Sequence, residues 1–89
     1  MTLPKHRLAT HPGEVLLEEC IKPLELTQAA LAKDLGISTN RLNELVRGKR
    51  GITADTAIRL AGRFRTSPEF WMNLQTAYEL TEARLAAKD

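Results

Sequence analysis

Apolar side chains recur every three or four residues along most of the chain, and capping residues, glycines and prolines divide the pattern into five segments. No segment alternates apolar and polar positions at a period of two, which is the pattern of half-buried strands. The sequence therefore predicts an all-α fold with five helices. With 89 residues, the chain is expected to form a single domain.

The first predicted helix begins at the sequence HPGE, residues 11–14, because proline is favoured in the first helical turn and glutamate near its positive end. His11 is expected to cap this helix and Pro23 to end it. The apolar stripe between them is expected to face the core. It comprises Leu16, Leu17, Cys20 and Ile21.

Two short helices follow, separated only by the tight turn Gly36-Ile37-Ser38. Thr27 and Ser38 are expected to cap the N-termini of these two helices. Gly36 is expected to end the first of them, because glycine readily adopts the left-handed conformation found at helix C-termini. Small and apolar residues occupy positions where two such helices cross closely. They are Ala32, Ile37, Leu42 and Leu45. This spacing predicts a helix-turn-helix, although a helical hairpin of another kind, in a protein-interaction module, would share it.

Thr53 is expected to cap a fourth helix, and Ser67-Pro68-Glu69 to open a fifth whose apolar residues cover more than one face. Aromatic residues at this spacing are often core, but four short helices cannot cover every face of the fifth. Paired DNA-reading helices also need a twofold axis. We therefore predict a homodimer interface, with the core as the alternative role, at Phe70, Trp71, Leu74 and Tyr78.

The net charge of +2 conceals an uneven distribution. Residues 27–65 carry eight basic and three acidic side chains, a net charge of +5, whereas residues 1–26 and 66–89 carry net charges of −1 and −2. A basic middle with acidic flanks favours a polyanion partner for the middle segment, here double-stranded DNA.

The third predicted helix exposes hydrogen-bonding side chains once its apolar residues face the core. The N-terminal part of such a helix enters the major groove, so its polar residues are candidates for base contacts. These are Thr39, Asn40, Arg41 and Asn43. Phosphate contacts are expected from Gln28, Ser38, Lys49 and Arg50. Glu44 is expected to face solvent or pair with a basic neighbour, and an ordinary solvated polar face is the alternative for the whole set.

Other classes of function find little support in the sequence. The soft metal ligands His6, His11 and Cys20 match no zinc spacing, and no catalytic motif is present, so we expect no metal, no cofactor and no enzyme. A lone cysteine, and the lack of an apolar run of signal or membrane-spanning length, lead us to expect a cytoplasmic protein.

Three blocks of the sequence carry a resemblance to a known family. They are HPGE at residues 11–14, GKRGITADTAIRL at 48–60 and SPEFWMNLQ at 67–75. Through them the stretch 11–80 resembles the HigA-type antitoxins, a branch of the Xre-like helix-turn-helix regulators. The resemblance implies a lambda-repressor-like domain whose recognition helix presents Thr39, Asn40 and Arg41. It also implies an antitoxin that binds a RelE-like ribonuclease toxin and, as a homodimer, represses the operon encoding both. A solitary Xre-like repressor is the alternative.

The chain thus divides into an N-terminal arm, residues 1–10, expected to be mobile, and a helix-turn-helix domain, residues 11–89, whose last helix dimerises. The first helix carries an acidic face, formed by Glu14, Glu18 and Glu19. A toxin that cleaves RNA must attract phosphate and is expected to be basic, so complementary charge favours this face as its contact. The alternative is a solvated acidic face.

Overall fold

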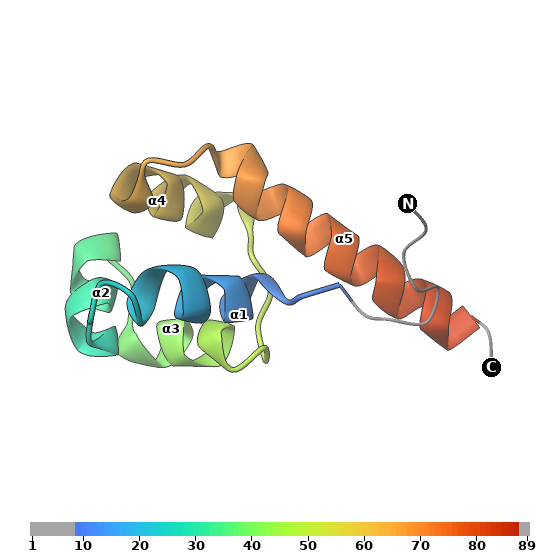
Figure 1. Cartoon of the computed structure of the whole chain (residues 1–89), viewed down its shortest axis with the longest axis horizontal. Coiled ribbons are helices and arrows are strands. Elements are labelled where there is room, and N and C mark those ends of the chain that lie inside the picture. The colour runs from blue at the N-terminus through green and yellow to red at the C-terminus, as the bar shows by residue number, and fades with distance from the viewer. Residues whose placement is uncertain (1–8, 88–89) are drawn as a thin grey trace.

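The computed structural model describes residues 9–87, and over this range the chain is helical, with no strand (Figure 1). The elements are α1 (Pro12–Leu16), η1 (Leu17–Ile21), α2 (Gln28–Leu35), α3 (Thr39–Val46), α4 (Ala54–Phe64) and α5 (Pro68–Ala87). Because η1 continues α1 directly, the all-α class with five helical segments is confirmed. Apart from its last two residues, the predicted N-terminal arm lies outside the described residues.

The helix starts expected from the sequence are confirmed by side-chain caps. The hydroxyl groups of Thr27, Ser38 and Thr53 each accept a hydrogen bond, 3.0 to 3.3 Å long, from the backbone amide three residues later. Each bond satisfies an N–H group that the first helical turn leaves without a partner. Gly36 ends α2 in the left-handed conformation, with φ of 74°.

The first helix departs from the expected α-helical spacing in its second half, η1, which is π-helical. The backbone amide of Lys22 donates to the carbonyl oxygen of Leu17 at 2.9 Å, a bond that spans five residues instead of four. Beyond the first turn of this helix, the buried side chains are Leu16 and Ile21, which are accordingly five residues apart. Leu17 and Cys20, which were expected to face the core, are only half-buried.

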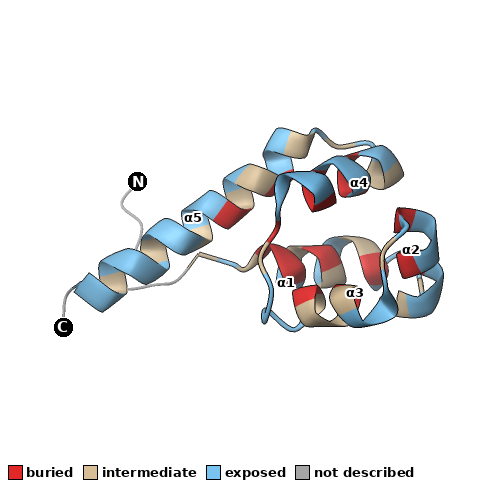
Figure 2. Ribbon diagram, turned by 180° about the vertical axis from the view of Figure 1, so that it is seen from behind, coloured by how far each residue is buried: buried red, intermediate tan, exposed pale blue. Residues whose placement is uncertain are grey.

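One hydrophobic core joins all the helices. Figure 2 shows buried positions along the surfaces where α1, α2, α3 and α4 face one another, and only near the start of α5. The remainder of α5 extends away from the other helices (Figure 1). The large side chains with 0 to 1% exposure are Leu16, Leu31, Leu42, Leu45, Leu60 and Trp71.

Trp71 lies in the hydrophobic core. The core was the alternative to the dimer interface for the aromatic residues of the fifth helix. Its side chain is 0% exposed, and its Nε1 donates a hydrogen bond to Thr66 Oγ1 at 2.7 Å. It therefore has no accessible surface for a second copy of the chain. Phe70, 42% exposed, and the half-buried Leu74 and Tyr78 remain accessible on α5.

Gly13 permits a close helix crossing that its place in the HPGE block did not reveal. A Cβ atom at this position would overlap the carbonyl oxygen of Leu45 at the end of α3. Only glycine lacks that atom, so it lets α1 lie directly against the backbone of the predicted recognition helix. Gly13 thereby helps to fix how α3 is seated.

A buried glutamine fastens the loop between α3 and α4 to α5. Gln75, 7% exposed, accepts a hydrogen bond from the backbone amide of Ile52 at 2.7 Å and donates to Glu79 Oε2 at 2.8 Å. An unpaired buried amide would cost about 1–3 kcal/mol, so the side chain satisfies a group that the loop cannot pair itself. The loop that follows α3 is thus held in one position.

We expect the free energy of unfolding to decrease by up to about 1 kcal/mol below pH 6.5, because His11 caps α1 as a neutral imidazole. Its Nδ1 accepts a 2.9 Å hydrogen bond from the backbone amide of Gly13, and a protonated Nδ1 could not. Burial lowers the pKa of His11, against the opposing influence of Glu82 and Glu14. Its stabilisation is therefore complete above the unfolded-state value of 6.5 and is lost as pH falls through the folded-state pKa.

Urea denaturation at about pH 7.5 and about pH 5 would measure this loss. His11→Asn provides the control, because asparagine caps a helix without titrating in this range. Carboxylates common to both proteins contribute equally to the change in the free energy of unfolding between the two pH values. Subtracting one change from the other therefore leaves the contribution of His11. An equal pH dependence in both would contradict the assignment of His11 as the titrating cap.

Candidate nucleic-acid interface

Helices α2 and α3 and the turn between them form a helix-turn-helix. The turn is closed by a 3.1 Å hydrogen bond from the backbone amide of Ile37 to the carbonyl oxygen of Ala32, next to the left-handed Gly36. Leu42 and Leu45 turn one face of α3 into the core. The opposite face is polar, and the N-terminal residues Thr39 and Asn40 are exposed on it.

Asn43, a predicted base contact, and Gln28, a predicted phosphate contact, lie against each other. Asn43 Nδ2 donates a hydrogen bond to Gln28 Oε1 at 3.2 Å. The bond joins the first residue of α2 to the middle of α3. This pair therefore borders the exposed face of α3 on the side of α2.

Arg41, another predicted base contact, is directed toward α4. Its Nη2 donates to Thr56 Oγ1 at 2.6 Å and to Asp55 Oδ2 at 3.1 Å, and its side chain is 28% exposed. Asp55 also accepts from Arg59 Nε at 3.0 Å. Hydrogen bonds from Arg59 and then Arg41 lower the pKa of the Asp55 carboxyl group. Asp55 lies within one of the sequence blocks that carry the family resemblance, but the sequence alone indicated no role for it at the DNA surface.

The loop after α3 presents the two basic residues predicted to contact phosphates, and both are exposed. Arg50 donates from Nε at 3.1 Å and from Nη2 at 2.8 Å to the same oxygen, Glu44 Oε1. The expectation that Glu44 pairs with a basic neighbour is thus confirmed. Lys49 forms no ion pair with any residue that the structure describes. Ser38, the fourth candidate, is exposed and caps α3.

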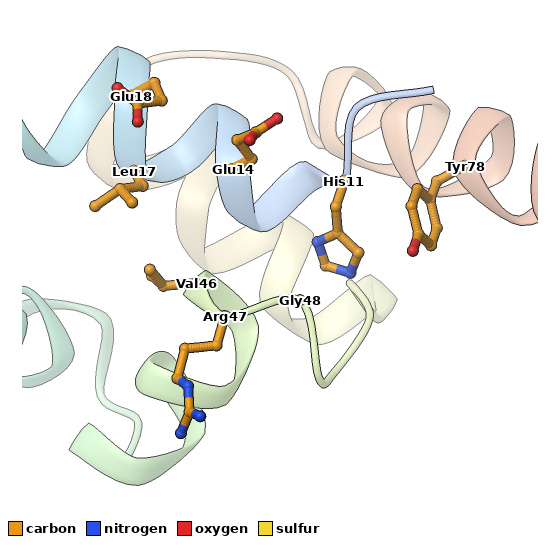
Figure 3. A pocket seen from close by; sticks show the side chains of 8 residues that line it. All are labelled: His11, Glu14, Leu17, Glu18, Val46, Arg47, Gly48 and Tyr78. Atoms are coloured by element: carbon orange, nitrogen blue, oxygen red, sulfur yellow. The ribbon is translucent and has the colours of Figure 1, made fainter. Parts of the chain in front are cut away.

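An open pocket of about 340 Å³ is lined by residues of α1, η1, the end of α3 and α5. Figure 3 shows the side chains that line it. Glu14 and Glu18, two of the predicted toxin contacts, lie along one side. Tyr78 of α5 lies on another, with its ring edge-to-face against His11 at 4.8 Å between centroids. The pocket is lined by His11, Glu14, Leu17, Glu18, Val46, Arg47, Gly48 and Tyr78.

The acidic residues of this side are exposed, and Glu18 forms an ion pair with Lys22 at 2.9 Å. Within residues 9–87, no group of three or more histidine, cysteine, aspartate or glutamate side chains is arranged to hold a metal ion. None of the helices described is both long and apolar enough to cross a membrane.

Comparison with known proteins places this geometry in a family. The model of the helix-turn-helix family HTH_3 matches residues 17–71. Virulence-associated protein I of Dichelobacter nodosus is 55% identical over 75 residues, which cover 84% of this chain and 69% of that protein.

Two solved structures share the fold closely. The antitoxin GraA superposes with a TM-score of 0.90 at 43% identity, over 93% of this chain and 89% of that one. Pseudomonas aeruginosa antitoxin HigA, solved with the higBA promoter, gives a TM-score of 0.85 at 47% identity, over 88% of this chain and 85% of that one.

Proposed function

This chain belongs to the helix-turn-helix family HTH_3, and we propose that it is an operator-binding antitoxin. In this proposal a homodimer represses its own operon and neutralises a RelE-like, mRNA-cleaving toxin. The observation that carries it is the exposed polar face of α3, followed by the basic loop, in a chain that is 47% identical to a HigA antitoxin solved with its promoter.

In the proposed complex, the N-terminal part of α3 enters the major groove. Thr39 and Asn40 are exposed there and have no side-chain hydrogen bond with another described residue, so they can turn to base edges. Arg41 and Asn43 are each bonded to another side chain, but Arg41 Nε and Nη1 and Asn43 Oδ1 form no such bond with a described residue. The phosphate contacts come from Gln28, Ser38, Lys49 and Arg50, which set the register of the protein on the duplex.

Dimerisation is assigned to the accessible part of α5. Two recognition helices must be held about one helical turn of DNA apart, which a single copy cannot do. Phe70, Leu74 and Tyr78 supply aromatic and aliphatic surface on a helix that extends beyond the other elements (Figure 1). Trp71 supports this interface from within the core.

The toxin is assigned to the acidic face of α1 and η1. Glu14, Glu18 and Glu19 are exposed there, and two of them border the open pocket of Figure 3. A basic ribonuclease would be attracted to this face and repelled by the basic loop after α3. The two partners would then occupy separate surfaces of the same antitoxin.

Footprinting on the promoter of the chain's own operon is expected to show a protected inverted repeat, with half-sites about one helical turn apart. Asn40→Ala should weaken binding by about 1–3 kcal/mol and relax the preference at one or two base positions. Lys49→Ala, the matched control, should weaken binding to all sequences alike, because a phosphate contact carries no base information. Absence of a protected repeat would contradict the proposed function, and identical base profiles for both variants would contradict the division of roles.

A further inference from the structure

The exposed face of α3 carries one acidic side chain, Glu44, and we propose that this residue reads a cytosine in each half-site of the operator. The inference rests on the proposed function and adds to it a determinant of sequence specificity. The sequence alone indicated no role for Glu44 at the DNA surface.

The position of Glu44 follows from the helical repeat of α3. Asn40, Glu44 and Arg47 are spaced i, i+4 and i+7, so they share one face of the helix, opposite the buried Leu42 and Leu45. Asn40 and Arg47 are exposed, and the side chain of Glu44 between them is 37% exposed. A helix that enters the major groove with this face directs Glu44 toward base edges.

Two polar side chains of α3, those of Asn43 and Arg41, lie at the two borders of that face. Asn43 is bonded to Gln28 of α2, and Arg41 is bonded to Asp55 and Thr56 of α4. These bonds hold Asn43 and Arg41 toward the neighbouring helices, away from the middle of the face. Glu44 lies in the middle of the face, and its own hydrogen bonds leave half of its carboxylate available.

The hydrogen bonds of Glu44 leave a defined acceptor. Arg50 Nε and Nη2 both donate to Oε1, at 3.1 and 2.8 Å, while Oε2 accepts no hydrogen bond from any residue that the structure describes. An ionised carboxylate only accepts hydrogen bonds. In the major groove, cytosine offers the N4 amino donor, guanine and thymine offer acceptors, and adenine places its N7 acceptor beside its amino group. Oε2 is therefore suited to cytosine.

Arg50 also reduces the repulsion between the Glu44 carboxylate and the DNA phosphates. DNA phosphates would repel a lone negative charge. The guanidinium group of Arg50 balances the negative charge of Glu44, with Arg50 Nη2 2.8 Å from Glu44 Oε1. The two-nitrogen contact also limits the rotation of the carboxylate. Arg50 is thus a positioning residue for Glu44, in addition to its assignment as a phosphate contact.

The test is a scan of all base substitutions in the operator, read as relative affinities of the full-length protein. Wild-type protein should lose roughly tenfold in affinity when one particular cytosine in a half-site is replaced. Glu44→Gln keeps the shape of the side chain but adds an amide donor, which pairs with adenine N7 while its oxygen accepts from N6. This variant should prefer adenine at that one position, with the other positions unchanged. Glu44→Ala should lose the preference there.

Glu69→Gln, the same chemical change in the first turn of α5, is the matched control and should reproduce the wild-type profile. A uniform loss of affinity for Glu44→Gln with an unchanged base profile would overturn the inference, since Glu44 would then act only through Arg50. That result would leave the proposed function intact. Failure of the wild-type protein to discriminate any base would overturn the proposed function, and this inference with it. Thermal unfolding of each variant verifies that it is folded.

Discussion

Trp71→Ala is expected to lower the free energy of unfolding by about 3–5 kcal/mol. Trp71 is among the largest fully buried side chains, and its removal leaves a cavity where α5 meets the core. The hydrogen bond to Thr66 is lost as well. The total free energy of unfolding of a small domain is about 5–15 kcal/mol, so the variant should be partly unfolded at physiological temperature. Urea denaturation followed by circular dichroism measures the change, because Trp71 is the sole tryptophan and its own fluorescence disappears.

The neighbouring Phe70 provides the matched control. It is 42% exposed, so Phe70→Ala should cost far less folding free energy while weakening a dimer formed through α5. Sedimentation at several protein concentrations separates the two effects, because the stability of a dimer depends on concentration. Trp71→Phe keeps most of the ring and should cost about 1 kcal/mol for the lost hydrogen bond. A Trp71→Ala protein destabilised by less than about 1 kcal/mol would contradict the core assignment.

The features that the sequence predicts well are those set by neighbouring residues. Thr27, Ser38 and Thr53 cap helices through bonds that span three residues, and Gly36 stops α2 through its own backbone conformation. Such interactions depend on local spacing and are visible in a single sequence. They suffice to predict the helix-turn-helix and the polar face of α3.

The features that the sequence did not reveal depend on contacts between distant segments. Arg41 meets Asp55 and Thr56 across 14 and 15 residues, and Ile52 meets Gln75 across 23. Gly13 is required because the backbone of α3 passes close to it at Leu45. No pattern among the neighbours of Gly13 in the sequence predicts this contact. Gln75 did carry a signal, since a polar side chain one turn after Trp71 and beside Leu74 lies on a face expected to be apolar.

The π-helical half of the first helix was also missed. The apolar residues Leu16, Leu17, Cys20 and Ile21 satisfy α-helical spacing, so periodicity gave no reason to expect a wider turn. In the structure Leu16 and Ile21 are buried, and Glu18 and Glu19 lie between them on the exposed side. The wider turn therefore helps to set where Glu18 and Glu19 lie on the exposed side of the first helix.

Reversing two charges of that acidic face, Glu18→Lys and Glu19→Lys, is expected to slow association with a basic RelE-like toxin by about tenfold or more at low salt. The attraction of opposite charges acts before contact, so it raises the association rate and is screened as salt is added. Both side chains are exposed, and the ion pair of Glu18 with Lys22 contributes little to stability, so folding and operator binding should persist.

Stopped-flow mixing with the proposed toxin, the RelE-like protein expected from a neighbouring gene, measures the association rates at low and high salt. The comparison that isolates the surface is between Glu19→Lys on η1 and Glu69→Lys in the first turn of α5, which change the net charge equally. Glu19→Lys should be the slower of the two at low salt and should approach the wild-type rate at high salt, because only its charge faces the partner. Equal rates for both variants would exclude the acidic face as the docking surface. A wild-type protein that protects its operator but associates with no such neighbour would instead be a solitary repressor, with the acidic face left to solvent.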